Sequence, residues 1–329
     1  MNAHRLLPVG EQGPLQASRM LLQHLWRHAE LDALLIPAWD DEQRVPEPTL
    51  LEDPSRLDHA DPFAPFMPHN AAGMAITALQ QLQGRRFALA MHPCELASFR
   101  ELARSKGLDP NEALLISTDC LSAFALDDTE WRGEAGQDPQ HLTHEVLHFA
   151  SQGGILASRF RGGCQYCDQL VPDNIDVHIG VLGLETSRHM LVSILDMTLD
   201  QNLVRALHLA PEVPSDIAQR RERVLKNLFT WRKRTWEQAV STLDPNLATL
   251  EALSEHLTSC GPCRHRLQEH CPSFDPGWLQ LRREERLQDA LAWVESCGGC
   301  GTCEHECPDD YPLFMAIWFL KKTKTSKTA

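Results

Sequence analysis

Seven of the eleven cysteines lie beyond residue 259, in two runs whose spacing could hold inorganic clusters. The second run reads Cys297-x2-Cys300-x2-Cys303-x3-Cys307-Pro308, the spacing of bacterial ferredoxins. Its first three thiolates can bind three corners of one [4Fe-4S] cluster, and the glycines between them let the backbone approach the sulfurs. In ferredoxins of this type the fourth cysteine turns towards a second cluster.

The earlier run contains Cys260-Gly-Pro-Cys263, followed by Cys271-Pro272. Because two-cluster ferredoxins exchange their last ligands between runs, Cys271 is expected to complete the cluster of the second run. The predicted ligands of that cluster are Cys271, Cys297, Cys300 and Cys303.

The remaining cluster site, formed by Cys260, Cys263 and Cys307, is one ligand short. Arg266 stands where the first run should carry its third cysteine, and an arginine cannot bind iron. A [3Fe-4S] cluster or a ligand other than cysteine is therefore implied. Zinc is the alternative here, because His256-x3-Cys260-x2-Cys263 also has metal-ligand spacing.

Four further cysteines stand in the first half of the chain: Cys94, Cys120, Cys164 and Cys167. Cys94 and Cys120 each follow a predicted strand, at the edge where open α/β sheets place their ligands. Together with the Cys164-x2-Cys167 pair they predict one more [4Fe-4S] cluster. Two alternatives remain: lone cysteines that serve as small apolar side chains, and a redox-active disulfide at the pair.

A histidine pattern offers a rival zinc site. His144-Glu145-Val-Leu-His148 reads HExxH, which on a helix puts two imidazoles on one face. Ser151 stands where the longer metzincin motif needs glycine. The competing interpretation is an ordinary solvated or packed helix face.

The elements around these residues predict two domains. Residues 1–212 alternate helical and strand-like runs, which indicates an α/β domain with a mainly parallel sheet. Residues 213–329 carry amphipathic helical patterns without strand signals, which indicates an all-helical iron-sulfur domain. The expected helices are 15–29, 71–82, 96–105, 215–240, 247–257, 278–295 and 313–321, and the expected strands are 34–36, 87–91, 113–118 and 176–182.

Composition limits the classes of partner. The formal net charge of -14 disfavours nucleic acid, whose binding requires clustered Lys and Arg. No apolar stretch is long enough to span a bilayer, and no signal-peptide pattern opens the chain. We expect a soluble, cytoplasmic protein in a reducing compartment, where thiols stay free for metals.

The order of the cysteine motifs resembles the β subunits of F420-reducing hydrogenases and formate dehydrogenases over residues 15–183. The helical part resembles a dicluster ferredoxin module. The segments that carry the first resemblance are Pro93-Cys94-Glu95-Leu96, Ile116-Ser117-Thr118-Asp119-Cys120-Leu121, Cys164-Gln165-Tyr166-Cys167 and Asp176-Val177-His178-Ile179-Gly180. Ser122 stands where a glycine often follows the Cys-Leu pair in that family.

The resemblance implies FAD, an iron-sulfur cluster and a place in a multisubunit complex. The expected function is an electron-transfer subunit with two or three [4Fe-4S] clusters, one of which could be [3Fe-4S]. It would relay electrons between a soluble carrier and a catalytic partner in a hydrogenase, formate dehydrogenase or heterodisulfide-reductase-like complex. The alternative is a zinc-stabilised scaffold or regulatory protein without a redox role.

Overall fold

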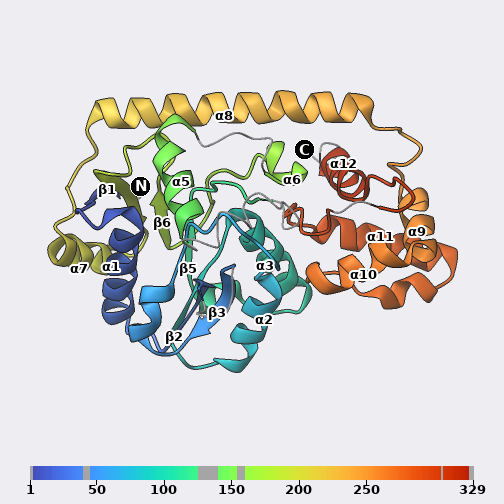
Figure 1. The fold of residues 1–329 in the computed structure, drawn as a ribbon. Helices are drawn as coiled ribbons and strands as arrows, with labels where there is room; N and C mark the ends of the chain where they lie inside the picture. The colour runs from blue at the N-terminus through green and yellow to red at the C-terminus, as the bar shows by residue number, and fades with distance from the viewer. Residues whose placement is uncertain (1–2, 40–44, 125–139, 154–159, 305–306, 326–329) are drawn as a thin grey trace.

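The computed structural model describes residues 3–39, 45–124, 140–153, 160–304 and 307–325. A seven-stranded sheet with its flanking helices occupies one side of the molecule, and shorter helices gather at the other side (Figure 1). Helix α8 (Ser215–Thr242) runs above both parts and links them.

The sheet is mixed, so the prediction of a mainly parallel sheet was wrong. Its strand order is β1-β7-β6-β5-β4-β2-β3; the central pairs from β2 to β6 are parallel, whereas β1, β3 and β7 pair antiparallel. Short connections account for two of the antiparallel pairs, because eight residues separate β2 from β3 and eight separate β6 from β7, fewer than the dozen or so that a parallel crossover needs. The strands are β1 (Ala3–Pro8), β2 (Ala33–Ala38), β3 (Glu47–Leu51), β4 (Phe87–Ala90), β5 (Leu114–Thr118), β6 (Val177–Gly180) and β7 (His189–Ile194).

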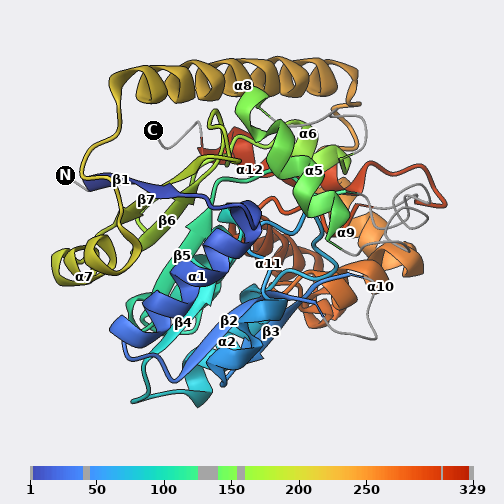
Figure 2. The same cartoon turned by 60° about the vertical axis from the view of Figure 1, so that its left-hand side comes forward.

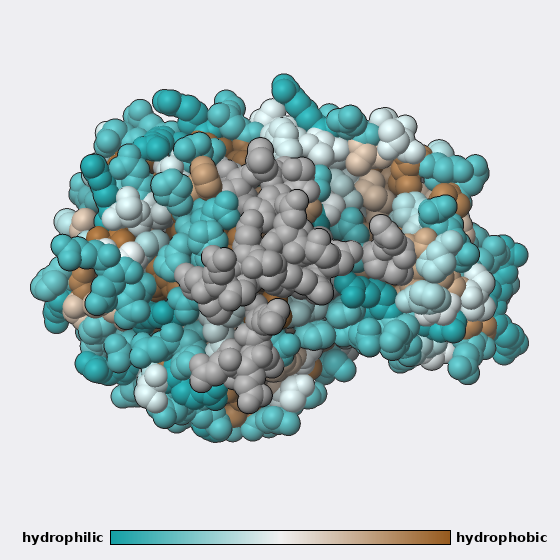
Figure 3. Space-filling view, in the orientation of Figure 1, coloured by the Kyte–Doolittle hydropathy of each residue, from teal (hydrophilic) through white to brown (hydrophobic). Residues whose placement is uncertain are grey.

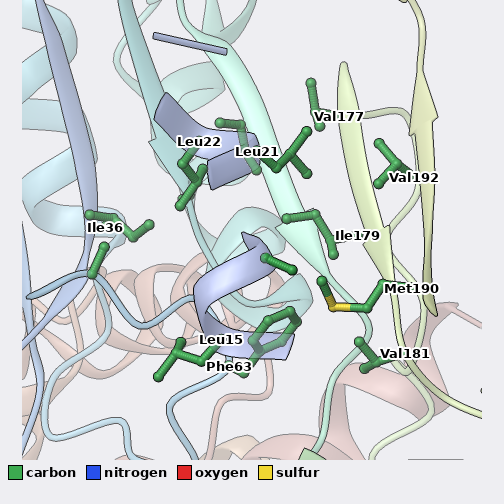
Figure 4. Close-up of a cluster of buried hydrophobic side chains, with 14 of the residues drawn as sticks. Leu15, Leu21, Leu22, Ile36, Phe63, Val177, Ile179, Val181, Met190 and Val192 are labelled. Carbon is green, nitrogen blue, oxygen red and sulfur yellow. The ribbon is translucent and has the colours of Figure 1, made fainter. Parts of the chain in front are cut away.

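Helices cover both faces of the sheet. Alternate residues of β2 face opposite sides: Leu34 and Ile36 pack with α1 (Gly13–His28), and Leu35 packs with α2 (Ala72–Gln81) and α3 (Pro93–Ser105). Figure 2 shows α1 lying across its face of the sheet, and Figure 4 shows its leucines meeting side chains of β6 and β7. The first part also contains α5 (His141–Phe149), α6 (Gly162–Gln165), α7 (Met197–Leu207) and the 3-10 helices η1 (Pro54–His59), η2 (Pro110–Glu112) and η3 (Ala150–Gln152).

Beyond residue 212 the described chain is helical, as predicted. Helix α10 was not foreseen, because it is largely polar and buries few side chains, among them Cys263 and Leu267. The elements after α8 are α9 (Leu250–Ser259), α10 (Gly261–His270), η5 (Pro276–Gln280), α11 (Arg283–Ser296) and α12 (Leu313–Thr325). In the described segments no helix is both long and apolar enough to cross a bilayer. The face in Figure 3 is mainly hydrophilic, with scattered apolar patches.

The second cysteine run packs directly against the first part of the chain. At Gly298 a Cβ atom would overlap the Cys94 carbonyl oxygen and the Ser98 hydroxyl of α3. The Gln169 side chain also donates a hydrogen bond to the Gly298 carbonyl at 3.2 Å. The glycine therefore lets two cysteine segments distant in sequence approach each other.

Gly298→Ala is expected to destabilise the protein by about 1–3 kcal/mol, because the added methyl group forces α3 and the cysteine run apart. Urea unfolding followed by circular dichroism measures the loss. Gly10→Ala is the matched control, since a Cβ atom there meets nothing within 4 Å. Equal stability of the two variants would contradict the close approach.

Candidate metal centres

Four cysteines of the first part line one enclosed cavity at the edge of the sheet: Cys94, Cys120, Cys164 and Cys167. Because β4 and β5 are parallel neighbours, the residues that follow their carboxyl ends meet at the same edge. Cys94 follows β4 in the first turn of α3, and Cys120 follows β5. Short helix α6 brings the Cys164 pair to them.

Burial makes these thiols difficult to ionise in the protein alone. It raises the pKa of Cys120 to about 11 and that of Cys167 to about 12. Burial, followed by the neighbouring Cys300 thiol, raises the pKa of Cys94 well above its ordinary value. Such thiols become thiolates when a metal centre supplies compensating positive charge.

Two buried arginines lie beside the first cavity. Arg232 of α8 donates hydrogen bonds to the Cys167 carbonyl at 2.9 Å and to the Ser122 hydroxyl at 2.7 Å. Arg161 donates to the carbonyls of Met67 and Cys300. Both side chains are buried, with only 6% of each residue's surface exposed. Within the described ranges neither arginine forms an ion pair with a carboxylate. Their charges suit an anionic iron-sulfur cluster in the cavity.

Ser122 has a backbone conformation that usually favours glycine, the residue expected here from the family resemblance. Its φ of 74° lies in the left-handed region. Serine supplies the hydroxyl that accepts the hydrogen bond from Arg232.

A second enclosed cavity is lined by all four predicted ligands of the ferredoxin-type cluster: Cys271, Cys297, Cys300 and Cys303. Burial raises the pKa of Cys297 to about 12 and that of Cys303 well above its ordinary value. The Gly299 amide donates to the Cys297 sulfur at 3.4 Å, the kind of contact that tunes a cluster's potential. Side chains of the first part, Asn70 and Ser98, complete the wall.

The two cavities are adjacent, because Cys300 lines both. It also packs in the small apolar cluster of Met67, Cys94 and Ala123. Nothing in the sequence indicated that the ferredoxin-type run would meet the Cys94 set.

The three cysteines of the incomplete site lie together, and His256 joins them. Their ligand atoms and the imidazole nitrogen all lie within 4.8 Å of one another. Cys307 Sγ is 3.3 Å from Cys263 Sγ and 4.0 Å from Cys260 Sγ. The His256 Nε2 atom is 3.1 Å from Cys263 Sγ and 3.6 Å from Cys307 Sγ.

The HExxH pattern falls on α5 but gathers no metal site in the part of the chain that the structure describes. His144 and His148 are exposed and Glu145 is half-buried, while the helix buries Leu142 and Val146 on its other face. This placement fits the solvated helix face.

Asp119 forms a buried ion pair that the sequence did not indicate. It precedes Cys120 and binds Arg221 of α8 through both carboxylate oxygens, with Nη2 to Oδ1 at 2.9 Å. His178 contacts the same carboxylate at 2.9 Å. Burial opposes ionisation, but the charge and hydrogen bonds of Arg221 prevail and hold the pKa of Asp119 well below its ordinary value. At Gly183 a Cβ atom would overlap the Arg221 backbone.

A larger cavity of about 770 Å³ between β6, β7 and α8 is the candidate place for FAD. The FAD pyrophosphate needs cationic side chains or a glycine-rich turn. The described lining residues include no glycine and no lysine. Arg221 is already paired with Asp119, and Asp176 and Glu222 add negative charge. The cavity does not fit FAD, and we derive no step through a flavin.

No protein-family model matches the chain. Among solved structures, a chain of the F420-reducing [NiFe] hydrogenase complex from Methanosarcina barkeri is similar, with a TM-score of 0.50 and 12% sequence identity. The similarity covers 72% of this chain and 91% of that chain. At such low identity the similarity is evidence about the fold alone: the two chains share an overall fold over the matched part.

Proposed function

We propose that this chain is an iron-sulfur electron-transfer subunit of a multisubunit oxidoreductase. The observation that carries the proposal is the pair of adjacent cavities, each lined by four predicted cluster ligands and sharing Cys300. A [4Fe-4S] cluster in each cavity would accept and release one electron at a time. Their adjacency provides a short path from one cluster to the other.

The difference in burial suggests where electrons enter. In the second set Cys271, Cys297 and Cys300 are half-buried and only Cys303 is buried. In the first set Cys94, Cys120 and Cys167 are buried and only Cys164 is half-buried. The second cavity is therefore the better placed to exchange electrons with a soluble carrier. The first would pass them to or from a catalytic partner subunit, and the net charge of -14 suits docking to a basic partner surface.

Metal analysis of the anaerobically purified full chain tests the proposal. We expect about eight iron atoms and as many sulfides per chain, corresponding to two [4Fe-4S] clusters, with broad visible absorption that dithionite bleaches. A colourless protein containing only zinc would instead support the zinc-stabilised scaffold, because zinc has no redox chemistry.

A further inference from the structure

The site formed by His256, Cys260, Cys263 and Cys307, called the His256 site below, has the dimensions of a single metal ion. Four ligands arranged tetrahedrally around zinc, with Zn–S near 2.3 Å and Zn–N near 2.0 Å, lie about 3.5–3.8 Å apart. Four of the six pairs are 3.1, 3.3, 3.6 and 4.0 Å apart, and no pair exceeds 4.8 Å. The four ligand atoms are therefore close enough together to share one ion.

An iron-sulfur cubane needs a wider arrangement. Each of its thiolates binds a different iron, and the sulfide-bridged core lies between them. Among the described residues, only the His256 site brings its ligand atoms this close together, and neither set of four cysteines around the two cavities does so. At the His256 site the sulfurs approach to within contact distance of each other. Arg266, at the position of the missing cysteine, points elsewhere and contacts His270 Nε2 at 2.9 Å.

The His256 site is closed, as structural zinc sites are. All four ligand residues are buried, from Cys263 with no exposed surface to His256 and Cys307 with 9%. Tyr311 stacks on the His256 ring at a centroid distance of 4.0 Å, and its hydroxyl donates to the Leu247 carbonyl at 2.7 Å.

The ligands come from segments that a metal would hold together. Cys260 ends α9 and begins α10, two helices that lie next to each other in Figure 1. His256 is in α9, Cys263 is in α10, and Cys307 is the last cysteine of the second run. The ion would thus join the two helices to the segment that leads into α12.

We infer that the His256 site binds one Zn²⁺ ion, with three thiolates and one imidazole as ligands, and serves a structural role. The chain then carries two iron-sulfur clusters and one redox-inactive ion. This inference is independent of the proposed function, because its evidence is the geometry of the His256 site alone. Zinc is favoured over other ions by the sulfur-rich, tetrahedral ligand set.

Zinc X-ray absorption of the anaerobically purified wild-type chain tests the coordination directly and requires no variant to fold. We expect one zinc per chain, with three sulfur scatterers near 2.3 Å and one nitrogen near 2.0 Å. Four sulfur scatterers would place the zinc in a cluster cavity and overturn the inference. So would the absence of zinc together with about three or four iron atoms beyond those of two clusters.

Paired variants then assign the ion to its residues. Cys263→Ser should lose the zinc and keep both the iron and the visible absorption. Cys303→Ser, the matched control, should keep the zinc and lose iron from the second cavity. Loss of iron without loss of zinc in Cys263→Ser would overturn the inference. If neither variant contains iron, the proposed function fails, while the zinc measurement still decides whether the His256 site binds zinc.

Discussion

Cys167→Ser is expected to remove about four iron atoms per chain, the content of one [4Fe-4S] cluster, and to leave the second cluster in place. In the described structure Cys167 lines the first cavity and not the second. Serine is a poor ligand for iron, because its hydroxyl is far harder to ionise than a thiol. Iron quantification and electron paramagnetic resonance of the reduced protein measure the loss. The signal of the remaining cluster should also lose any coupling to its neighbour.

Cys303→Ser provides the reciprocal variant, because Cys303 lines only the second cavity in the described structure. It should lose a similar amount of iron and retain the first cluster. Cys300→Ser is not selective, since Cys300 contacts both cavities, and it should disturb both signals. Complete loss of iron in both selective variants would contradict two separately held clusters.

Asp119→Asn is expected to destabilise the fold by about 3–5 kcal/mol, because it leaves the Arg221 charge buried without its partner. The Asp119 side chain has no exposed surface, and that of Arg221 is 10% exposed. The depressed pKa of Asp119 means that its ionised form stabilises the fold above the ordinary carboxyl pKa of about 4. The stabilisation by ionised Asp119 is lost only as the pH falls from about 4 towards the lowered pKa. The stability lost in Asp119→Asn should therefore be constant between about pH 6 and 8.

Urea unfolding of Asp119→Asn, Arg221→Met and the double variant separates the pair from its surroundings. Removing both charges leaves neither one unpaired, so the double variant should lose less stability than the two single variants added together. Glu185→Gln is the control, because the ion pair of Glu185 with Arg220 is exposed to solvent. This variant should lose less than about 1 kcal/mol of stability. Strict additivity at Asp119 and Arg221 would argue against a direct interaction.

Most of the longer helices and the central strands could be predicted because they depend on local patterns, although α7 and α10 were not among the expected helices. The apolar runs at 34–36, 87–91, 113–118 and 176–182 coincide with β2, β4, β5 and β6. The antiparallel strands were not predicted. For β3 the reason is its composition: it contains Pro48 and lies in a stretch rich in Pro and Asp, which does not look like a strand, but an edge strand tolerates proline. Pairing direction itself depends on how the connections run in space.

Of the candidate sites, the sequence determined by itself which cysteines are close along the chain, because ligand spacing within a short loop is a local property. Only the tertiary structure decided which distant groups meet. It brought Cys307 to the local group of His256, Cys260 and Cys263, Cys300 to the Cys94 set, and two arginines to a cavity of thiols. These contacts join residues from 44 positions apart, for Cys263 and Cys307, to 206 positions apart, for Cys94 and Cys300. They depend on the packing of α8 and of the glycine-rich run, which no short sequence pattern encodes.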